Sequence, residues 1–253
     1  FYYGYAPVSP ANPELKWEGA TQINLGIDAV LFRNLSVTLD LYKKKTKDML
    51  MSQKLPGYVG NTDDPVANIA SMDGKGIELN LTYNTKLGKD VDFSASGNIA
   101  YSTNTITNIG SVEYISKATM QASNYEVIRY MAGKPYGMFW GFRTNGIFQT
   151  QAEVDSYLNA KGEKIQPNAK PGDFRWKDLN GDGQITSDDR ENLGTAIPPF
   201  TYGITLKAAY KNFDIMAFGQ GVAGNKICNQ IRRLDVPTSN YTRAALGRWV
   251  GPG

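Results

Sequence analysis

The sequence predicts an all-β fold, an antiparallel transmembrane β-barrel with long extracellular loops, and three observations support this prediction. Apolar and polar residues alternate along several segments, which is the pattern of a strand with two different faces. These segments run for about 10 residues or more, whereas globular strands average about 5–6 residues and membrane-spanning strands need about 9–11. Short turns also alternate with long connections, as they do in outer-membrane barrels.

The first alternating pair comprises residues 21–32 and 35–46, which a short turn at residues 33–34 connects. In the first segment, the apolar residues at odd positions from Ile23 to Leu31 share one face, and polar residues occupy most of the other. Two such segments across a tight turn predict a β-hairpin.

The same pattern predicts two further hairpins. Residues 76–85 and 91–102 form one alternating pair, and residues 200–210 and 213–221 form the other. Each pair is again joined by a short polar turn, so six strands are expected in all.

Between the hairpins we expect long loops at residues 43–75 and over much of 103–199. Weaker strand patterns occur within the second loop, near 125–133 and 137–149. A helix is predicted over 150–162, since Thr150 is a plausible N-cap and Gly162 a plausible stop. The apolar residues of this helix at helical spacing are Val154, Tyr157 and Leu158.

Composition excludes several classes of function. The chain has 253 residues with 27 basic and 24 acidic side chains, a near balance that does not suggest a nucleic-acid partner. It contains no histidine, which removes histidine triads and histidine zinc sites, and its one cysteine, Cys228, excludes an internal disulfide. Carboxylates such as Asp63 and Asp64 have no spacing that singles out a glycosidase pair, so we expect no enzymatic activity.

Residues 177–190 resemble a calcium-binding loop. Short oxygen-bearing side chains fall at alternate positions before Gly183, and another carboxylate follows six residues later, which is the spacing that lets a backbone curl around Ca²⁺. Residue 184 would contribute its backbone carbonyl. The predicted metal ligands are Asp178, Asn180, Asp182, Gln184 and Asp189. The alternative is an Asp/Asn/Gly turn that its own hydrogen bonds hold without a metal.

Several longer segments resemble one family. "NPELKWEGATQINLGIDAVLF" followed by "SVTLDLYKKKTKDML", then "YMAGKPYGMFWGFRTNGIFQTQAEV", and finally "KPGDFRWKDLNGDGQITSDDRENLGTAIPPFTYGI" occur in this order. In content and order they resemble the SusC/RagA-type TonB-dependent outer-membrane transporters of Bacteroidetes. The resemblance runs from about Asn12 to Gly224.

This resemblance implies a barrel of about 22 strands in the outer membrane, filled by a plug. It also implies a SusD-like lipoprotein lid, energy from the TonB complex, and import of an oligosaccharide or peptide. Residues 1–253 would then be a partial C-terminal barrel domain without the plug, the TonB-contacting segment and the final strands. The alternative is a soluble calcium-dependent carbohydrate-binding or adhesion β-domain, which would bury Ile23, Leu25 and Ile27.

In a barrel, the apolar faces would contact outer-membrane lipid and the polar faces would line the lumen. Tyrosines near the strand ends are then expected to form the aromatic girdles at the two membrane interfaces: Tyr42, Tyr83, Tyr101, Tyr202 and Tyr210. Three aromatic residues of the second long loop either support the loop fold or stack on sugar rings: Tyr136, Phe139 and Trp140.

Overall fold

The computed structural model describes residues 11–53, 58, 63–120, 125–229 and 240–252. It consists of two units, which are described separately. The first unit comprises Phe1–Ile115, Tyr130–Tyr136 and Ile197–Lys226, and the second comprises Ser116–Arg129, Gly137–Ala196 and Ile227–Gly253. Within the described ranges, no helix has the length and hydropathy that a membrane-spanning helix requires.

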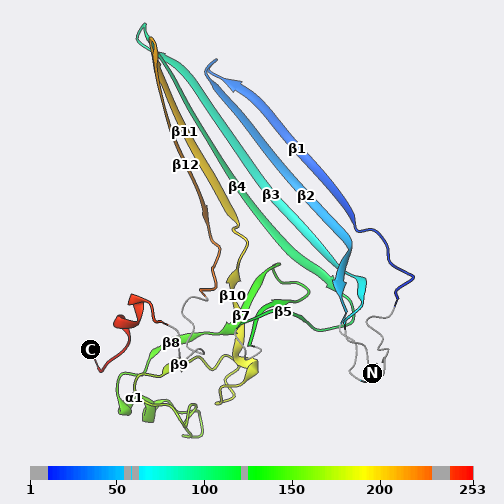
Figure 1. Ribbon diagram of the computed structural model, residues 1–253, viewed down its shortest axis with the longest axis vertical. Coiled ribbons are helices and arrows are strands. Elements are labelled where there is room, and N and C mark those ends of the chain that lie inside the picture. Colours follow the sequence, from blue (N-terminus) through cyan, green and yellow to red (C-terminus); the bar gives the residue numbers. More distant parts are fainter. Residues whose placement is uncertain (1–10, 54–57, 59–62, 121–124, 230–239, 253) are drawn as a thin grey trace, which may run out of the picture. The chain divides into compact units, whose positions relative to one another are not determined.

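The first unit is built on a six-stranded antiparallel sheet with the order β1-β2-β3-β4-β11-β12 (Figure 1). Its strands are β1 (Gly19–Leu31), β2 (Leu35–Ser52), β3 (Val66–Leu87), β4 (Val91–Ile109), β11 (Phe200–Tyr210) and β12 (Phe213–Ala223). The three predicted hairpins are confirmed, and their tight turns lie at the same end of the sheet.

Left-handed backbone geometry closes these turns. Phe32 and Arg33 both have positive φ, at 52° and 66°, and the β11–β12 turn places Lys211 at 54°. Gly88, at 69°, performs the same role between β3 and β4. The β11–β12 turn has two residues and the other two turns have three each. Left-handed residues in such short turns fit the right-handed twist of the flanking strands.

The prediction of a long loop at 43–75 is wrong. β2 continues to Ser52 and β3 begins at Val66, so the strands extend well beyond the residues that alternate clearly. A bulge follows Thr46, where the β2–β3 register shifts and Asp48 adopts a φ of 56°. Asn68 holds this region, since its amide donates to the Asp48 carbonyl at 2.6 Å.

At the same end, β4 extends beyond its pairing with β11. Thr105 pairs with Pro135 from the chain's return segment, and the Gly133 amide donates to the Ile106 carbonyl at 2.7 Å. A small apolar core forms where these extensions meet. Its buried members are Ala67, Ala70, Ile106 and Ile109.

The second unit contains short strands within the predicted loop region. A four-stranded sheet has the order β10-β7-β6-β5, and β8 pairs with β9. The strands are β5 (Ile115–Met120), β6 (Tyr125–Tyr130), β7 (Met138–Phe142), β8 (Thr144–Ile147), β9 (Phe174–Trp176) and β10 (Arg190–Thr195). The weak strand patterns near 125–133 and 137–149 therefore correspond to real strands.

The predicted loop helix is shorter than 150–162. Helix α1 spans Gln151–Ser156, and the Thr150 hydroxyl caps it by accepting from the Glu153 amide at 3.2 Å. The helix stops early because Leu158 forms a β-bridge with Lys164. Val154 is buried as expected, but Leu158 is 43% exposed and does not join the core.

The segment before β9 and the segment 240–252 meet at Gly172. This residue has a φ of 97°, and a Cβ there would lie 2.6 Å from Cε3 of Trp249. The Trp249 indole also donates to the Gln149 side chain at 2.9 Å. The absence of a side chain at residue 172 therefore allows the indole to pack directly on the backbone.

We predict that Gly172→Ala displaces Trp249, because the new methyl group would overlap the indole and also strain the left-handed backbone. Tryptophan fluorescence and near-UV circular dichroism of the intact protein measure the displacement. Gly146→Ala is the matched control, since Gly146 has a φ of 103° but has no atom within 4 Å of the added Cβ. If the two substitutions had equal effects, backbone strain alone would explain them, and overlap of the methyl group with Trp249 would be contradicted.

Candidate functional site

The six-stranded sheet has one continuous apolar face. Because paired residues of neighbouring strands point to the same side, the register places apolar side chains in rows across the sheet. One row contains Leu25, Leu41, Ile77, Tyr101, Phe200 and Ala223. The next row of this face contains Ile27, Leu39, Leu79, Ile99, Tyr202 and Gly221.

These side chains are open to the surroundings. Ile23, Leu25 and Ile27 are 72%, 63% and 60% exposed, and in the described part of the chain no second sheet covers them. A soluble sandwich would bury these residues, so this arrangement contradicts that alternative. An apolar face of such extent is typical of contact with lipid.

The opposite face of the same sheet is mainly polar. One row of this face lies, in register, between the two apolar rows named above and contains Gly26, Asp40, Glu78, Ala100, Thr201 and Val222. The next row of this face contains Asp28, Thr38, Asn80, Asn98, Gly203 and Gln220. Within the second of these rows, the Thr38 hydroxyl donates to Asp28 at 2.6 Å. A polar face behind a lipid-type face is the arrangement of a barrel wall around water.

The apolar band has the height that a bilayer requires. On β11 it runs from Phe200 to Tyr210, ten steps of about 3.3 Å. At a strand tilt of about 40°, this corresponds to about 25 Å, the height of the lipid-facing band in outer-membrane barrels. Aromatic rings mark both ends, with Tyr101 4.7 Å from Phe200 between centroids at one end, and Tyr210 opposite Phe213 at the other.

The girdle prediction is wrong for Tyr42. This residue lies in the middle of β2, on the polar face opposite Gly76, because β2 continues to Ser52. A Cβ at residue 76 would lie 2.6 Å from the Tyr42 ring, so the ring lies across the glycine of the neighbouring strand. The other predicted tyrosines occupy the apolar face.

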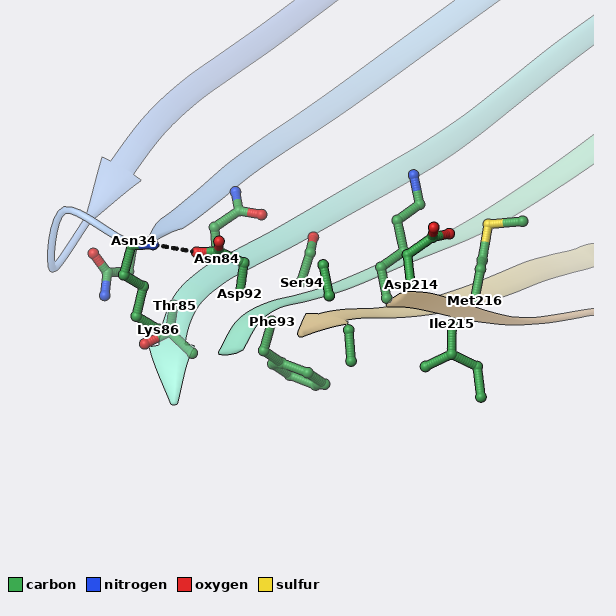
Figure 2. A pocket seen from close by; sticks show the side chains of 13 residues that line it. Asn34, Asn84, Thr85, Lys86, Asp92, Phe93, Ser94, Asp214, Ile215 and Met216 are labelled. Atoms are coloured by element: carbon green, nitrogen blue, oxygen red, sulfur yellow. Dashed lines mark ion pairs between the residues drawn. The ribbon is translucent and has the colours of Figure 1, made fainter. Parts of the chain in front are cut away.

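A hollow lies at the tight-turn end of the sheet, and Figure 2 shows how its side chains alternate. Phe93 and Ile215 project from one side of the ribbon, whereas Ser94, Asp214 and Met216 project from the other. Among the polar side chains, Lys86 and Asp92 form an exposed ion pair at 2.7 Å. The polar side chains give this hollow a charged rim.

The predicted calcium-type loop is a closed turn that internal hydrogen bonds hold. Asp178 accepts from the amides of Gly181 and Gly183 at 2.7 and 2.8 Å. Asp189, which is fully buried, accepts from the amides of Leu179 and Thr186 at 2.8 and 2.7 Å. The two carboxylates therefore tie the beginning of the loop to its end.

The remaining predicted ligands lie on the exposed side of this loop. Asn180 accepts from the Asp182 amide at 3.0 Å, and Asp182 accepts from the Gln184 amide at 2.8 Å. In the ranges that the structure describes, no group of three or more Asp, Glu, His or Cys side chains is placed to hold a metal ion. The loop geometry thus matches the hydrogen-bonded turn, and calcium binding stays a prediction.

The environment of Asp189 favours its charged form. Burial raises the pKa of the carboxyl, but hydrogen bonds from the backbone of Thr186, Leu179 and Asn180, and from the Thr186 side chain, outweigh burial and lower the pKa. The carboxylate therefore stabilises the folded loop above the ordinary carboxyl pKa. This contribution is lost as the pH falls through the lowered pKa.

The loop aromatics make contacts within their own units. Tyr136 stacks on Tyr130 with 4.8 Å between ring centroids. The Arg129 guanidinium lies 4.7 Å from the centre of the Trp140 ring, and Phe139 pairs with Ile128 across β6 and β7. These contacts agree with a role in supporting the loop fold.

Sequence reasoning missed a charged cluster in the second unit. The Glu126 carboxylate accepts from the Arg129 guanidinium, with a distance of 2.8 Å to Nε, and lies 3.6 Å from the Arg190 guanidinium. The Glu126 and Arg129 side chains are only 10% and 11% exposed. No local pattern predicts this cluster, because β6 and β10 are far apart in the chain.

Comparison with known proteins identifies relatives over most of the chain. Residues 1–225 match the family model described as TonB dependent receptor-like, beta-barrel. TonB-dependent receptor P3 of Formosa agariphila is 29% identical over 94% of this chain and 24% of its own length. TonB-dependent receptor SusC of Bacteroides thetaiotaomicron is 28% identical over 84% of this chain and 20% of its own length. The chain thus spans about a quarter of these curated relatives or less.

Solved structures agree with the same fold. The structure of the RagAB peptide transporter matches with a TM-score of 0.64 and 25% identity, over 85% of this chain and 22% of the transporter chain. A second match, the RagAB peptide importer in its open-open state, has a TM-score of 0.64 and 23% identity, over 86% of this chain and 22% of that chain, and supports the fold alone.

We predict that Asp189→Asn loosens the loop by about 1–3 kcal/mol, because the new amide group faces a backbone donor that then lacks an acceptor. Limited proteolysis of the intact protein, followed by mass spectrometry of cuts within 177–190, measures the change. Asp188→Asn is the matched control, since the Asp188 side chain is exposed. Equal cleavage of the two variants would contradict a structural role for the buried carboxylate.

Proposed function

The chain belongs to the family of TonB-dependent receptor-like β-barrels, and we propose that the protein of which it forms part imports an oligomeric nutrient across the outer membrane. Receptors of this family are outer-membrane transporters and not enzymes, and the six-stranded sheet lies in that membrane. The proposal concerns the activity of the whole protein, its substrate and its partners.

One observation supports the proposal above the others. Over the apolar band, the regular register of the sheet gives a lipid face and a water face over the same height, so this segment forms a wall that separates lipid from an aqueous interior. The polar row that contains Asp28 and Asn98 then lines the route of the substrate.

Turn length orients the wall in the membrane. Outer-membrane barrels have short periplasmic turns and long extracellular loops. We therefore place the tight turns after Leu31, Leu87 and Tyr210 on the periplasmic side, and the opposite ends of the strands, where the chain leaves β4 and returns at β11, on the exterior side.

The proposed substrate is an oligosaccharide or a peptide. The RagAB structure that is 25% identical is named as that of a peptide transporter, which supports the peptide class. The relation to SusC supports membership of the same transporter type. We propose that a SusD-like surface lipoprotein covers the exterior opening and that the TonB complex supplies energy.

An uptake experiment tests this function. Cells that produce the intact transporter with its neighbouring lipoprotein should accumulate labelled oligopeptides or oligosaccharides, and accumulation should stop when TonB is deleted. Cells without the transporter provide the baseline. Uptake of neither class above this baseline, with the protein present in the outer membrane, would contradict the proposal.

The calcium-type loop is a separate part of the proposal. We propose that Ca²⁺ adds to a loop that hydrogen bonds already hold, because a carboxylate oxygen that accepts one amide retains further acceptor capacity. A weak extracellular site binds calcium at about 10⁻⁴–10⁻³ M. Millimolar calcium should slow proteolysis within 177–190 of the intact transporter more than millimolar magnesium does. Identical cleavage with calcium, magnesium or chelator would refute calcium binding.

The wall assignment leads to a prediction for Leu81, which lies on the apolar face in one row with Gly97 and Ile204, near the middle of the apolar band on β11. Leu81→Arg should destabilise the intact protein in liposomes by about 2–4 kcal/mol, the cost of arginine at the bilayer midplane. Thr82→Arg, one residue further on the polar face, should cost much less. Urea unfolding followed by gel mobility measures both. A larger loss for Thr82→Arg would reverse the assignment of the faces.

A further inference from the structure

On β2 and β3 the apolar face ends at lysines, whereas Ile23 continues it in the same row on β1. Directly beyond the row that contains Leu41 and Tyr101, the same face places Lys43 opposite Lys75, and the next row contains Lys45. All three lysines are exposed. Lys47, which is paired with Gly19, continues the basic series on β2.

The lysines have little compensation from the protein itself. Like charges directly opposite one another on antiparallel strands destabilise a sheet. Among the ion pairs of the described residues, none includes Lys43, Lys45 or Lys75. One carboxylate, Asp73, lies opposite Lys45, but its Oδ1 atom is buried without a hydrogen-bond partner in the described part of the chain. The patch therefore carries a net positive charge.

The position of the patch identifies its surroundings. Side chains two residues apart on a strand lie about 7 Å apart along it, so Lys43 is one step beyond Leu41 and the lipid-facing rows. Lysine side chains at such a boundary extend their ammonium groups toward the headgroups while their aliphatic stems stay against apolar surface. The patch lies near the middle of β2 and β3, just beyond the apolar band on the side away from the tight turns, which is the exterior side in the proposed orientation.

We infer that Lys43, Lys45 and Lys75 bind the phosphate of an anionic lipid headgroup in the outer leaflet. The inference rests on the proposed function for the orientation of the wall. Charge complementarity favours an anion, and continuity with the lipid-facing rows favours a lipid over a soluble protein. Thr103 and Thr105 follow Lys75 and Asp73 in the same two rows and add hydroxyl donors beside the lysines.

The test uses the intact transporter in nanodiscs of phosphatidylcholine with or without phosphatidic acid, whose headgroup is a phosphate. Native mass spectrometry counts the phosphatidic acid molecules that stay bound. Each lysine near an anionic surface contributes about five-fold in binding, so the variant Lys43→Gln/Lys45→Gln/Lys75→Gln should lose most of the bound lipid. The single variants Lys43→Gln and Lys75→Gln should each lose about five-fold, which preserves the test if the triple variant does not fold.

Lys44→Gln is the matched control. Lys44 is exposed and adjacent in sequence, but it lies on the polar face with Gln22 and Gly74. Its substitution should leave lipid binding unchanged. Retention of phosphatidic acid by the Lys43 and Lys75 variants at the level of Lys44→Gln would overturn the inference. Displacement of the lipid by millimolar inorganic phosphate would overturn it also, because the site would then recognise free phosphate.

The outcome separates the lipid site from the transport function. Wild-type protein that imports substrate but shows no preference for phosphatidic acid would refute the lipid site and leave the proposed function intact. Wild-type protein that inserts and prefers phosphatidic acid but imports nothing would support the site and contradict the function.

Discussion

The structure of the wall depends on a hydrogen-bond register that is uninterrupted across six strands over the height of the apolar band. A slip of one residue would move every side chain of a strand to the opposite face, so lipid would meet polar groups and the lumen would become apolar. The register shifts in β2, β3 and β4 occur beyond the apolar band, between Thr46 and Leu50 and between Ser71 and Met72. The β1–β2, β11–β12 and β4–β11 pairings contain no shift. Irregularity is thus confined to the part of the sheet outside the bilayer.

The sequence was sufficient to predict the hairpins because a two-faced strand in lipid needs strict alternation. Alternation disappears where the lipid ends, and this explains the error at 43–75. After Leu41 the apolar face continues with lysines, so the strand persists while its pattern does not. The position of Tyr42 was misjudged for the same reason. The strands near 125–133 and 137–149 gave only weak patterns, because they are short and one of them, β7, pairs with β10, which is far away in the chain.

The loop at 177–190 shows why the chemistry of a site is harder to predict than its shape. A calcium ion binds carboxylate oxygens and a backbone amide donates to them, so the same spacing of Asp and Asn is compatible with either partner. The structure gives both Asp189 oxygens to amides at opposite ends of the loop. Spacing alone predicted that Asp178 and Asp189 both contribute oxygens to the loop. It did not show whether those oxygens bind an ion or accept hydrogen bonds from backbone amides.

The separation in sequence between β4 and β11 has a consequence for the variability of the protein. These neighbours pair along the full length of β11, although the chain between Ile109 and Phe200 contains most of the second unit. The entropy of closing such a connection grows only with the logarithm of its length, at about 0.6 kcal/mol for each doubling. The connection between β4 and β11 is therefore free to lengthen, shorten or be exchanged with little effect on the strands that it joins, so that variation there requires no redesign of the six-stranded sheet.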